Sequence, residues 1–418
     1  MIPGNQSFGP GVLDVTCEGR PFRPKGWEEM RKDLSSSAKR KPFMSRSSTV
    51  AAVTATVVAV VLAGGSASAA RPPRKPAAFH AQSVSWVSPE QGWMLGAARC
   101  GSDTCTTVVG TSDSGRIWKR LATLDAPLTL EEETGVTQIR FADDLHGWAF
   151  EPALWATADG GATWREKAPP GHGHLVLGLA GNADAVYALV SPCKLNHLCT
   201  DPVGLWRTTP GLGSWTRVPL TLPAFSGFNL AVLAVHGPVA YLDIPTPGSY
   251  DSDVLDVTVD GQSWSSRPDP CNKTNGEYLS SVAPISDSKV ALLCQSDIGF
   301  GKAAKRVFRS NDTGQTTTSA GTLPIYGIVN RLAATPNGTL VVSSFSIGSW
   351  IYRNAGGQTW TTSVDLGDGG MGWNDLVFTT DQVGYVIHGP AASPWLPGEL
   401  WKTEDGGVTW GGSVVAPS

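Results

Sequence analysis

The sequence predicts an all-β protein made of seven similar four-stranded antiparallel units in series. Three observations predict this fold class: an octapeptide that recurs along the chain, a second phrase that precedes each copy, and a composition rich in turn formers. The 418 residues include 48 glycines and 16 tryptophans, and only 16% of them are charged. Few charges and many glycines are typical of a sheet protein with many turns.

The octapeptide reads TEDGGVTW from Thr403 to Trp410, and it recurs as TADGGATW and TSDSGRIW. Four further copies read TTPGLGSW, TVDGQSW, SNDTGQTT and RNAGGQTW. Its last residue falls at Trp118, Trp164, Trp215, Trp264, Thr317, Trp360 and Trp410, with gaps of 46, 51, 49, 53, 43 and 50 residues. This period matches the length of a propeller blade, so each copy predicts one blade.

The second phrase is a polar turn followed by an apolar strand, as in SPEQGWML from Ser88 and ADDLHGWAF from Ala142. Four short strands per unit follow from this pattern, for example VTQIRFA, GWAF, LWATA and TWREKA. Seven such units predict a seven-bladed β-propeller, in which radial packing protects the sheet edges. A series of β-sandwiches is the alternative, but it needs seven separate cores of about 50 residues each, near the lower limit for a stable domain.

We expect the propeller to occupy residues 78–418. The predicted blades are 78–126, 135–170, 175–222, 228–270, 277–323, 327–366 and 372–415.

The first 77 residues have a different character. Residues 1–43 show no periodic pattern and are expected to be a disordered upstream extension. Residues 44–69 contain a basic start, an uncharged apolar run at 49–63 and a small-residue exit, which is the order of a secretory signal peptide. The alternative is an uncleaved anchor formed by 49–63, although about 20 residues are normally needed to span a bilayer. Residues 70–77 form a linker.

Removal of residues 1–69 makes the chain more acidic. That segment holds nine Lys/Arg and five Asp/Glu, so the remainder has 32 − 9 = 23 basic and 36 − 5 = 31 acidic residues, a net charge of −8. Nucleic acid is therefore not an expected partner. A membrane is expected as a partner only if 49–63 remains as an anchor.

The cysteines favour an exported protein. Cys17 falls in the upstream extension, and six remain, an even number that indicates disulfides in an oxidising compartment. The close pairs Cys100/Cys105 and Cys193/Cys199 predict local bridges, and Cys271 would then pair with Cys294, which we expect at the end of a second strand. Zinc is the alternative, but neither close pair has the spacing of a zinc knuckle.

The phrase S/T-x-D-x-G-x-T-W resembles the Asp-box, or BNR repeat, of sialidases and related propellers. Vps10/sortilin-type propellers and photosystem II assembly factor-like propellers carry similar repeats. The resemblance covers residues 78–418 and implies the fold rather than a function. Sialidases carry an Arg-Ile-Pro motif near the start of the propeller, which this chain lacks, and its arginines, such as Arg140, Arg207, Arg309 and Arg353, cannot be matched to the sialidase triad.

We interpret the octapeptide as a structural turn. Its Asp can accept backbone N–H groups, its Gly supplies a positive φ, and its Trp can pack against a sheet. Such turns, one per blade, would be spread round the rim and could not converge on one substrate. The structural residues are Asp113, Trp118, Asp159, Trp164, Trp215, Asp260, Trp264, Asp312, Trp360, Asp405 and Trp410.

Sialidase-like propellers bind their ligands on the face opposite the octapeptide turns, so the resemblance implies a ligand there, where all three predicted disulfides would lie. Candidate residues there are Glu131, Glu132, Glu133, His172, His174, Asp251, Asp253, Trp373 and Asp375. The acidic residues are better explained as solvated loop charges, and Trp373 as a core residue. His172 and His174 would share one face of an extended strand, but two histidines alone are weak evidence for a metal.

The sequence therefore supports two functions. The first is an exported, non-catalytic propeller that binds a protein, peptide or glycan through its disulfide-bonded face, without a cofactor or metal. The second is a glycoside hydrolase, either sialidase-like or with two carboxylates, which a carboxylate pair about 5–10 Å apart at the axis would favour.

Overall fold

A computed structural model describes residues 79–197, 199–225, 231–244, 254–271, 275–369, 371–389 and 398–418. The chain divides into two units, Met1–Arg71 and Pro72–Ser418, and every described residue belongs to the second. The upstream extension, the signal segment and the linker lie outside the described residues. Among the described residues, no helix has the length and apolar character needed to cross a membrane.

The second unit consists of seven four-stranded antiparallel sheets, as the sequence predicts. Blade 1 contains β1 (His80–Trp86), β2 (Gly92–Cys100), β3 (Asp103–Thr111) and β4 (Lys119–Leu124). Blade 2 contains β5 (Gln138–Phe141), β6 (Gly147–Phe150), β7 (Leu154–Thr157) and β8 (Arg165–Glu166). Blade 3 contains a 3-10 turn (Pro170–His172), β9 (Leu175–Gly181), β10 (Val186–Ser191), β11 (Gly204–Thr208) and β12 (Thr216–Arg217).

The remaining four blades follow the same order. Blade 4 contains β13 (Val232–His236), β14 (Val239–Asp243), β15 (Leu255–Thr258) and β16 (Trp264–Arg267). Blade 5 contains β17 (Tyr278–Pro284), β18 (Val290–Gly299), β19 (Lys302–Ser310) and β20 (Thr318–Thr322). Blade 6 contains β21 (Val329–Ala334), β22 (Leu340–Phe345), β23 (Ser349–Asn354) and β24 (Thr361–Leu366). Blade 7 contains β25 (Trp373–Phe378), β26 (Gly384–His388), β27 (Glu399–Thr403) and β28 (Gly411–Ser413).

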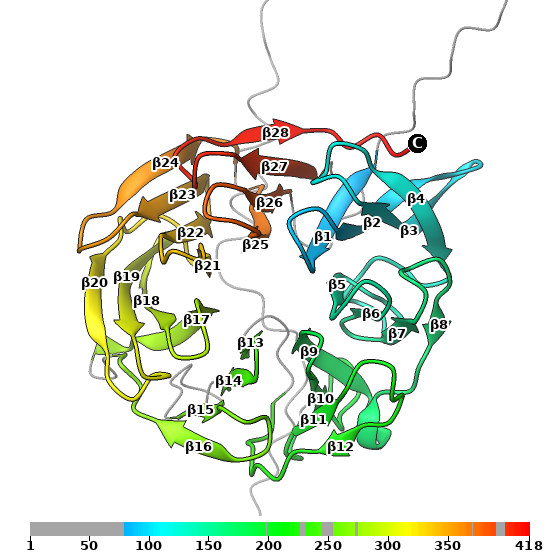
Figure 1. The fold of residues 1–418 in the computed structure, drawn as a ribbon, viewed down its shortest axis with the longest axis horizontal. Coiled ribbons are helices and arrows are strands. Elements are labelled where there is room, and N and C mark those ends of the chain that lie inside the picture. The colour runs from blue at the N-terminus through cyan, green and yellow to red at the C-terminus, as the bar shows by residue number, and fades with distance from the viewer. Residues whose placement is uncertain are drawn as a thin grey trace, which may run out of the picture. The chain divides into compact units, whose positions relative to one another are not determined.

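The blades are arranged in a ring round a central axis, with the first strand of each blade innermost and the fourth outermost (Figure 1). The connections between strands one and two, and between strands three and four, lie on one face, which we call the octapeptide face. The connections between strands two and three, and between successive blades, lie on the other, which we call the opposite face.

The core lies between neighbouring sheets. Trp93 of blade 1 stacks on Phe141 of blade 2 with ring centroids 3.7 Å apart, and the Trp93 indole donates to the Gly160 carbonyl at 2.9 Å. Seven clusters of buried apolar side chains account for this core, and all draw their members from residues 79–415. The propeller therefore contains its own core.

The octapeptide forms the turn between the third and fourth strands. In blade 2, Thr157 Oγ1 donates to Asp159 Oδ1 at 2.8 Å and accepts the Gly161 N–H at 3.1 Å. Asp159 also accepts the hydroxyl and the N–H of Thr163, at 2.6 and 2.9 Å, and these bonds lower the pKa of Asp159 to about 2. Gly161 has a φ of 91°, which only glycine adopts without strain. The same Thr/Ser-to-Asp hydrogen bond occurs at Asp113, Asp260, Asp312 and Asp405.

Two copies keep the turn without the Asp. Where Pro210 replaces it, Thr208 Oγ1 donates to the Ser214 carbonyl at 2.6 Å. Where Ala355 replaces it, the Asn354 amide donates to the Thr359 carbonyl at 2.9 Å. The carboxylate is therefore one of several ways to satisfy the same turn.

The final Trp of the octapeptide packs edge-on against another aromatic ring. Trp118 is buried, whereas the equivalents are half-buried: Trp164, Trp215, Trp264, Trp360 and Trp410. Five of these six make near-perpendicular ring contacts, with Trp86, Phe141, Trp148, Tyr187 and Phe378. Trp360 instead donates from its indole to the Ala320 carbonyl at 2.8 Å.

The ring closes through short contacts between its two ends. Every sheet is built from four consecutive strands, so no blade contains strands from both ends of the chain. Instead, the Phe79 N–H donates to the Val415 carbonyl at 3.1 Å, and the Ser418 N–H donates to the Trp118 carbonyl at 3.0 Å. The last residues thereby lie against blade 1.

Candidate functional site

The first strands of all seven blades enclose an axial cavity of about 430 Å3. Its surface is about half apolar, with leucine and valine side chains from blades 3, 4 and 5, and about half polar. Four charged residues contribute to the polar part: Arg140, Glu151, Arg331 and Asp375. A cavity that combines apolar side chains with convergent polar groups is the usual form of a ligand site.

Asp375 reaches the cavity because it occupies a bulge in β25. The register with β26 shifts between Asn374 and Leu376, which leaves Asp375 as the extra residue, and its φ is 42°. A bulge re-aims one side chain of a strand, here toward blade 1. The interpretation of Asp375 as a solvated loop charge is wrong, because β25 already begins at Trp373 and the Asp375 side chain is only 12% exposed.

The Asp375 carboxylate is held by four donors. The Arg140 guanidinium of blade 2 bonds both oxygens, at 2.7 Å to Oδ1 and 3.3 Å to Oδ2. The Ser83 hydroxyl and the Val84 N–H of blade 1 also donate to Oδ2, at 2.5 and 2.9 Å. The carboxylate therefore joins blades 7, 1 and 2, and most of its accepting capacity is used.

Glu151 lies in the connection between β6 and β7, on the opposite face. Glu151 is 2% exposed, and the Thr137 hydroxyl donates to its Oε2 at 3.0 Å. Burial raises the pKa of Glu151 to about 7; the Thr137 bond and the charges of Arg331 and Arg140 oppose this rise, and the charge of Asp375 adds to it. Glu151 is thus a carboxyl group that is partly protonated near neutral pH.

Arg331 of β21 brings a second guanidinium to the cavity. Burial lowers the pKa of Arg331, and the charges of Asp375 and Glu151 counteract this shift. Below pH 7 the four groups comprise two guanidiniums, one Arg-paired carboxylate and one largely neutral carboxyl. The cavity therefore carries an excess of positive charge, which favours an anionic group on a ligand.

The three candidate glutamates before blade 2 do not line this cavity. Glu131, Glu132 and Glu133 are exposed in the connection before blade 2. Glu133 Oε1 accepts the Leu195 N–H at 2.9 Å, so it contacts the loop closed by the second disulfide. Asp251 and Asp253 lie outside the described residues.

The histidine pair is not on one strand face. His172 ends the 3-10 turn with a φ of 60°, and His174 comes just before β9, with both side chains exposed. The expectation of a shared face is wrong, because the left-handed backbone at Gly171 and His172 turns the chain between the two rings. Among the described residues, neither histidine belongs to a group of three potential metal ligands.

Trp373 is a core residue rather than an exposed stacking platform. It is 2% exposed and lies against His388 and Trp401, with ring centroids at 4.5 and 5.4 Å. His388 Nε2 lies 2.7 Å from Asp368 Oδ2, which completes a buried polar and aromatic cluster in blade 7.

All three disulfides join the predicted partners. Cys100–Cys105 and Cys193–Cys199 close connections between second and third strands, on the opposite face. Cys271–Cys294 differs from the expectation, because β18 continues to Gly299 and Cys294 lies in the middle of the strand. This bridge therefore ties the connection before blade 5 to the interior of its second strand.

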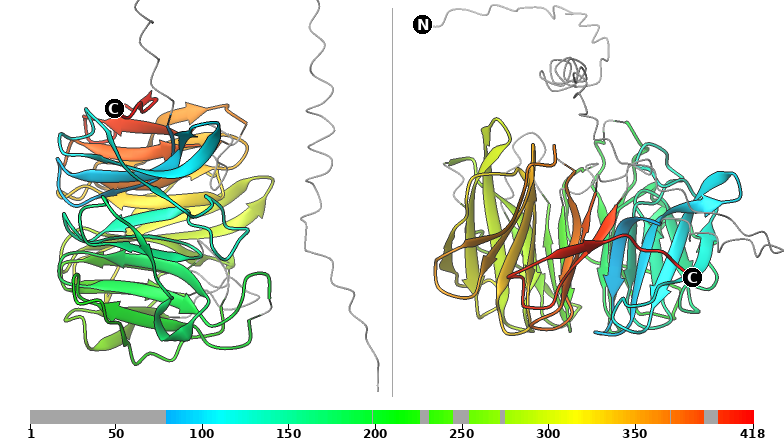
Figure 2. Two further views of the ribbon diagram at one scale, coloured as in Figure 1. Left: turned by 90° about the vertical axis from the view of Figure 1, so that its right-hand side faces the viewer. Right: turned by 90° about the horizontal axis from the view of Figure 1, so that it is seen from above.

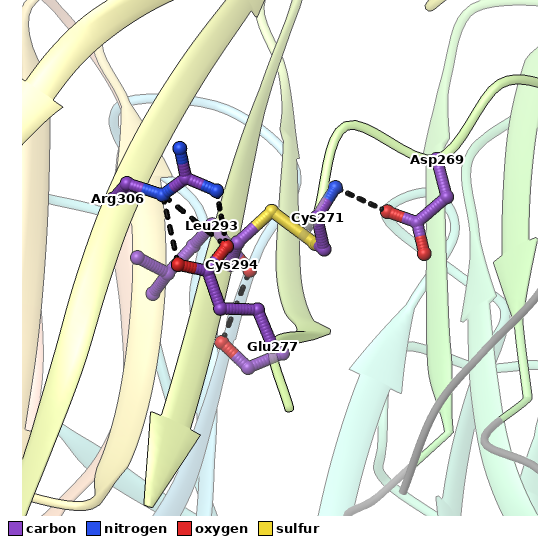
Figure 3. The surroundings of a disulfide bond; sticks show 7 residues. Asp269, Cys271, Glu277, Leu293, Cys294 and Arg306 are labelled. Carbon is purple, nitrogen blue, oxygen red and sulfur yellow. Dashed lines mark hydrogen bonds and ion pairs between the residues drawn. A yellow bond between two sulfur atoms is a disulfide. The ribbon is translucent and has the colours of Figure 1, made fainter. Parts of the chain in front are cut away.

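Cys271 and Cys294 belong to a buried apolar cluster, and several polar side chains lie near the bridge (Figure 3). The Cys271 N–H donates to Asp269 Oδ1 at 2.8 Å, and Glu277 pairs with Arg306 of β19 through both carboxylate oxygens. Asp269 and the two sulfurs lie within 4.8 Å of one another, but the sulfurs are bonded together and cannot act as thiolate ligands.

Sequence reasoning identified one of the four charged cavity residues. Arg140 was noted as a strand arginine without a site, and Glu151 and Arg331 were missed. A usable signal exists for Arg140, because the polar Gln138 and Arg140 alternate with Ile139 and Phe141 in an innermost strand and so share one face of a sheet whose inner edge borders the axis. Glu151 gave no such signal, because its burial depends on contacts with residues far along the chain.

No protein-family model matches the chain. Among curated proteins, it is similar to a xyloglucanase of Paenibacillus sp, with 22% identity over 225 residues, or 50% of this chain and 18% of that protein. The chain thus spans less than a fifth of the length of this relative.

Among solved structures, the sequence identities are also low. YCF48 bound to D1 peptide is 17% identical, with a TM-score of 0.48 over 79% of this chain and 94% of that one. The GH93 alpha-L-arabinofuranosidase of Fusarium graminearum in complex with arabinobiose is 13% identical, with a TM-score of 0.43 over 80% and 95%. The propeller fold expected from the sequence is confirmed by the seven four-stranded sheets of the chain itself.

Proposed function

We propose that this chain is a binding propeller whose ligand is an acidic peptide or protein segment held in the axial cavity. The state of Asp375 supports this proposal most directly. Four donors hold its carboxylate, including a two-point contact from Arg140. The carboxylate is therefore a poor nucleophile and serves to hold Arg140 in position. The remaining positive charge of Arg140 and Arg331 suits a carboxylate on the ligand, and the apolar lining suits its side chains.

The same arrangement makes binding dependent on pH. Near pH 6 Glu151 is largely protonated and the cavity keeps its positive charge, whereas near pH 8 ionised Glu151 offsets one guanidinium. An acidic peptide should therefore bind more tightly at pH 6 than at pH 8, and Glu151→Gln should remove this difference.

The test begins with a displayed peptide library selected on the wild-type chain. Binders are then measured by calorimetry on Arg140→Gln and Arg331→Gln, each of which removes one positive charge from the cavity. Arg353→Gln is the matched control, because Arg353 is a strand arginine that bonds the Gly406 carbonyl on the octapeptide face. We expect about tenfold or greater loss of affinity in the first two variants and none in the control. Peptides that bind all three variants equally would contradict the proposal.

A two-carboxylate glycoside hydrolase is the second candidate. It is favoured by one observation: Glu151, which carries a proton near neutral pH, shares a cavity with the Arg-paired carboxylate of Asp375. This is the combination of acid and base that glycoside hydrolysis uses. Release of reducing ends from xyloglucan, arabinan and β-glucan tests it, with Glu151→Gln and Asp375→Asn as the inactive variants. Because we propose binding rather than catalysis, we expect the wild-type chain to turn over neither these polysaccharides nor a fluorogenic sialoside.

We also propose that the chain is exported and that residues 44–69 are removed. Three disulfides and the order of basic, apolar and small residues in that segment support this. Sequencing of the mature N-terminus tests it. A first residue near 70 is expected, whereas a mature chain that retains 49–63 would indicate the anchor instead.

A further inference from the structure

Exposed apolar side chains gather at one place on the opposite face. They come from three loops of blades 5 and 6: the β18–β19 hairpin tip, the connection between the blades, and the β22–β23 turn. The tip cluster comprises Ile298, Phe300, Ile325, Tyr326, Ile328 and Ile347. Their exposed fractions range from 36% for Ile328 to 96% for Phe300.

Hydrogen bonds show that the three loops are contiguous. The Gly327 N–H and the Ser346 hydroxyl both donate to the Gly301 carbonyl, at 3.2 and 2.8 Å. The Ala303 N–H donates to the Ile325 carbonyl at 2.9 Å. The cluster is thus one surface formed by neighbouring tips, not a set of scattered residues.

The octapeptide face provides the contrast. Its exposed apolar residues occur in turns of five different blades, which are spread round the ring: Ile117, Leu145, Leu212, Val259 and Val408. Single exposed apolar residues are normal on a protein surface, whereas a contiguous patch marks an interaction site.

Phe300 is held outward against local preference. It lies between Gly299 and Gly301, and all three have positive φ values of 84, 55 and 70°. A bulky residue in this left-handed region is strained, and glycine or asparagine would be preferred there. The hairpin β18–β19 projects beyond the neighbouring strands (Figure 2), and a phenylalanine at its tip contributes little packing to the propeller.

The chemistry of the cluster is that of a bilayer interface. Lys302 Nζ lies 5.9 Å from the centre of the Tyr326 ring, so a cation and a phenol stand just behind the apolar tips. Tyrosine and lysine are favoured at the head-group level, where an apolar body and a polar end meet different surroundings. The segments 298–302, 325–329 and 346–348 contain no acidic residue, although Asp297 precedes the first of them.

We propose that the tip cluster inserts into the interface of a lipid bilayer and holds the opposite face of the propeller against a membrane. A fluid bilayer accepts a convex apolar surface without a complementary hollow, whereas a protein partner would need a surface shaped to match it. This attachment does not depend on the axial cavity binding a peptide, so the two proposals can fail separately.

Vesicle flotation tests the proposal with residues 72–418, which contain all seven core clusters and exclude the apolar run at 49–63. Vesicles of phosphatidylcholine alone, and with one fifth phosphatidylglycerol, are the probes. We expect the wild-type chain to float with both. Phe300→Ser combined with Ile347→Ser should lower the partition coefficient about tenfold or more, because two apolar anchors are lost. Leu212→Ser, at an apolar residue of the octapeptide face with an exposed fraction similar to that of Ile347, is the control and should change nothing.

Two further measurements distinguish the alternatives. Phe300→Trp should gain fluorescence quenching by brominated lipid relative to the wild type, and Lys302→Gln should weaken binding to the anionic vesicles only. Absence of flotation at millimolar lipid, or flotation that the double substitution leaves unchanged, would overturn the proposal. So would a concentration-dependent dimer that the double substitution abolishes, since the cluster would then be a contact between two copies.

Discussion

The guanidinium of Arg140 bonds both carboxylate oxygens of Asp375, although the two residues belong to blades 2 and 7. Blade 1 lies between them, and its Ser83 hydroxyl donates to the same carboxylate at 2.5 Å. This ion pair and its hydrogen bonds therefore connect blades 7, 1 and 2 near the axis, where the first and last blades of the ring meet. It is part of the scaffold as well as part of the cavity wall.

Asp375→Asn should lower the free energy of unfolding by about 2–3 kcal/mol, somewhat less than the loss of a fully buried partner, because the Arg140 side chain is 32% exposed. Arg140→Gln should have a similar effect. The double variant should lose less than the sum, by about 1–2 kcal/mol, because both changes break the same contact. Urea unfolding measures all three. Glu404→Gln, which breaks the exposed pair with Lys402, is the control and should have little effect.

Stability should pass through a minimum near pH 7 as two buried groups titrate. The folded chain holds the proton of Glu151 up to about pH 7 instead of 4.5, so this contribution to stability falls between pH 4.5 and 7. Burial lowers the pKa of Lys305 from 10.5 to about 7, so the unfolded chain binds more protons above pH 7 and stability rises from there to pH 10.5. Urea unfolding at a series of pH values measures both slopes.

Single substitutions separate the two slopes. Glu151→Gln should reduce the fall in stability between pH 4.5 and 7, and Lys305→Met should reduce the rise in stability from pH 7 to 10.5. Lys305 Nζ donates to the Gly327 carbonyl at 3.0 Å, so Lys305→Met also leaves an acceptor without its donor, and the slope rather than the absolute stability is the readout. If both slopes persist in the double variant, other groups control the pH dependence.

The disulfides should leave no free thiol in residues 72–418. A thiol reagent should label none of the six cysteines in the denatured, unreduced protein. Removal of Cys271–Cys294 with two alanines should cost about 3 kcal/mol, because its partners are 23 residues apart. Removal of Cys100–Cys105, with a separation of five, should cost about 2 kcal/mol. Uptake of two or more labels would show that a bridge does not form.

The octapeptide should be more sensitive at its Trp than at its Asp. Trp410→Ala should lower the free energy of unfolding by about 3 kcal/mol, because it removes a large ring that packs against Phe378. Asp405→Ala should cost about 1 kcal/mol, since the turns at Pro210 and Ala355 form without a carboxylate. Thermal unfolding compares the two. Loss of ligand binding in folded Asp405→Ala would indicate that the turn has a role beyond structure.

The repeat made most of the fold predictable. The octapeptide fixes a turn whose hydrogen bonds lie within eight residues, and the strands on either side follow from alternation, so local information sufficed for all seven sheets. Cys294 shows where local sequence information no longer suffices. Its place in the middle of β18 depends on a hairpin that continues to Gly299, and the polar residues near the end of that strand gave no signal of this length.

The site was less predictable because it is made by side chains from distant blades. Asp375 follows Asn374 and a glycine-rich stretch and was interpreted as a loop residue, but a single bulge places it in a strand and turns it toward the axis. Glu151 resembles an ordinary turn residue before a proline. Its raised pKa comes from burial among blades whose arrangement has to be known first.

The way the ring closes determines the order in which it can form. Because each sheet uses four consecutive strands, a blade can complete its hydrogen bonds as soon as its own 40–50 residues have left the ribosome. Blade 1 has no need to wait for a strand from the far end of the chain. Two long-range steps remain. The last residues must contact blade 1, as Val415 does through Phe79, and the ion pair between Asp375 and Arg140 must form. Assembly can therefore proceed blade by blade during synthesis, and only the final joint depends on the complete chain.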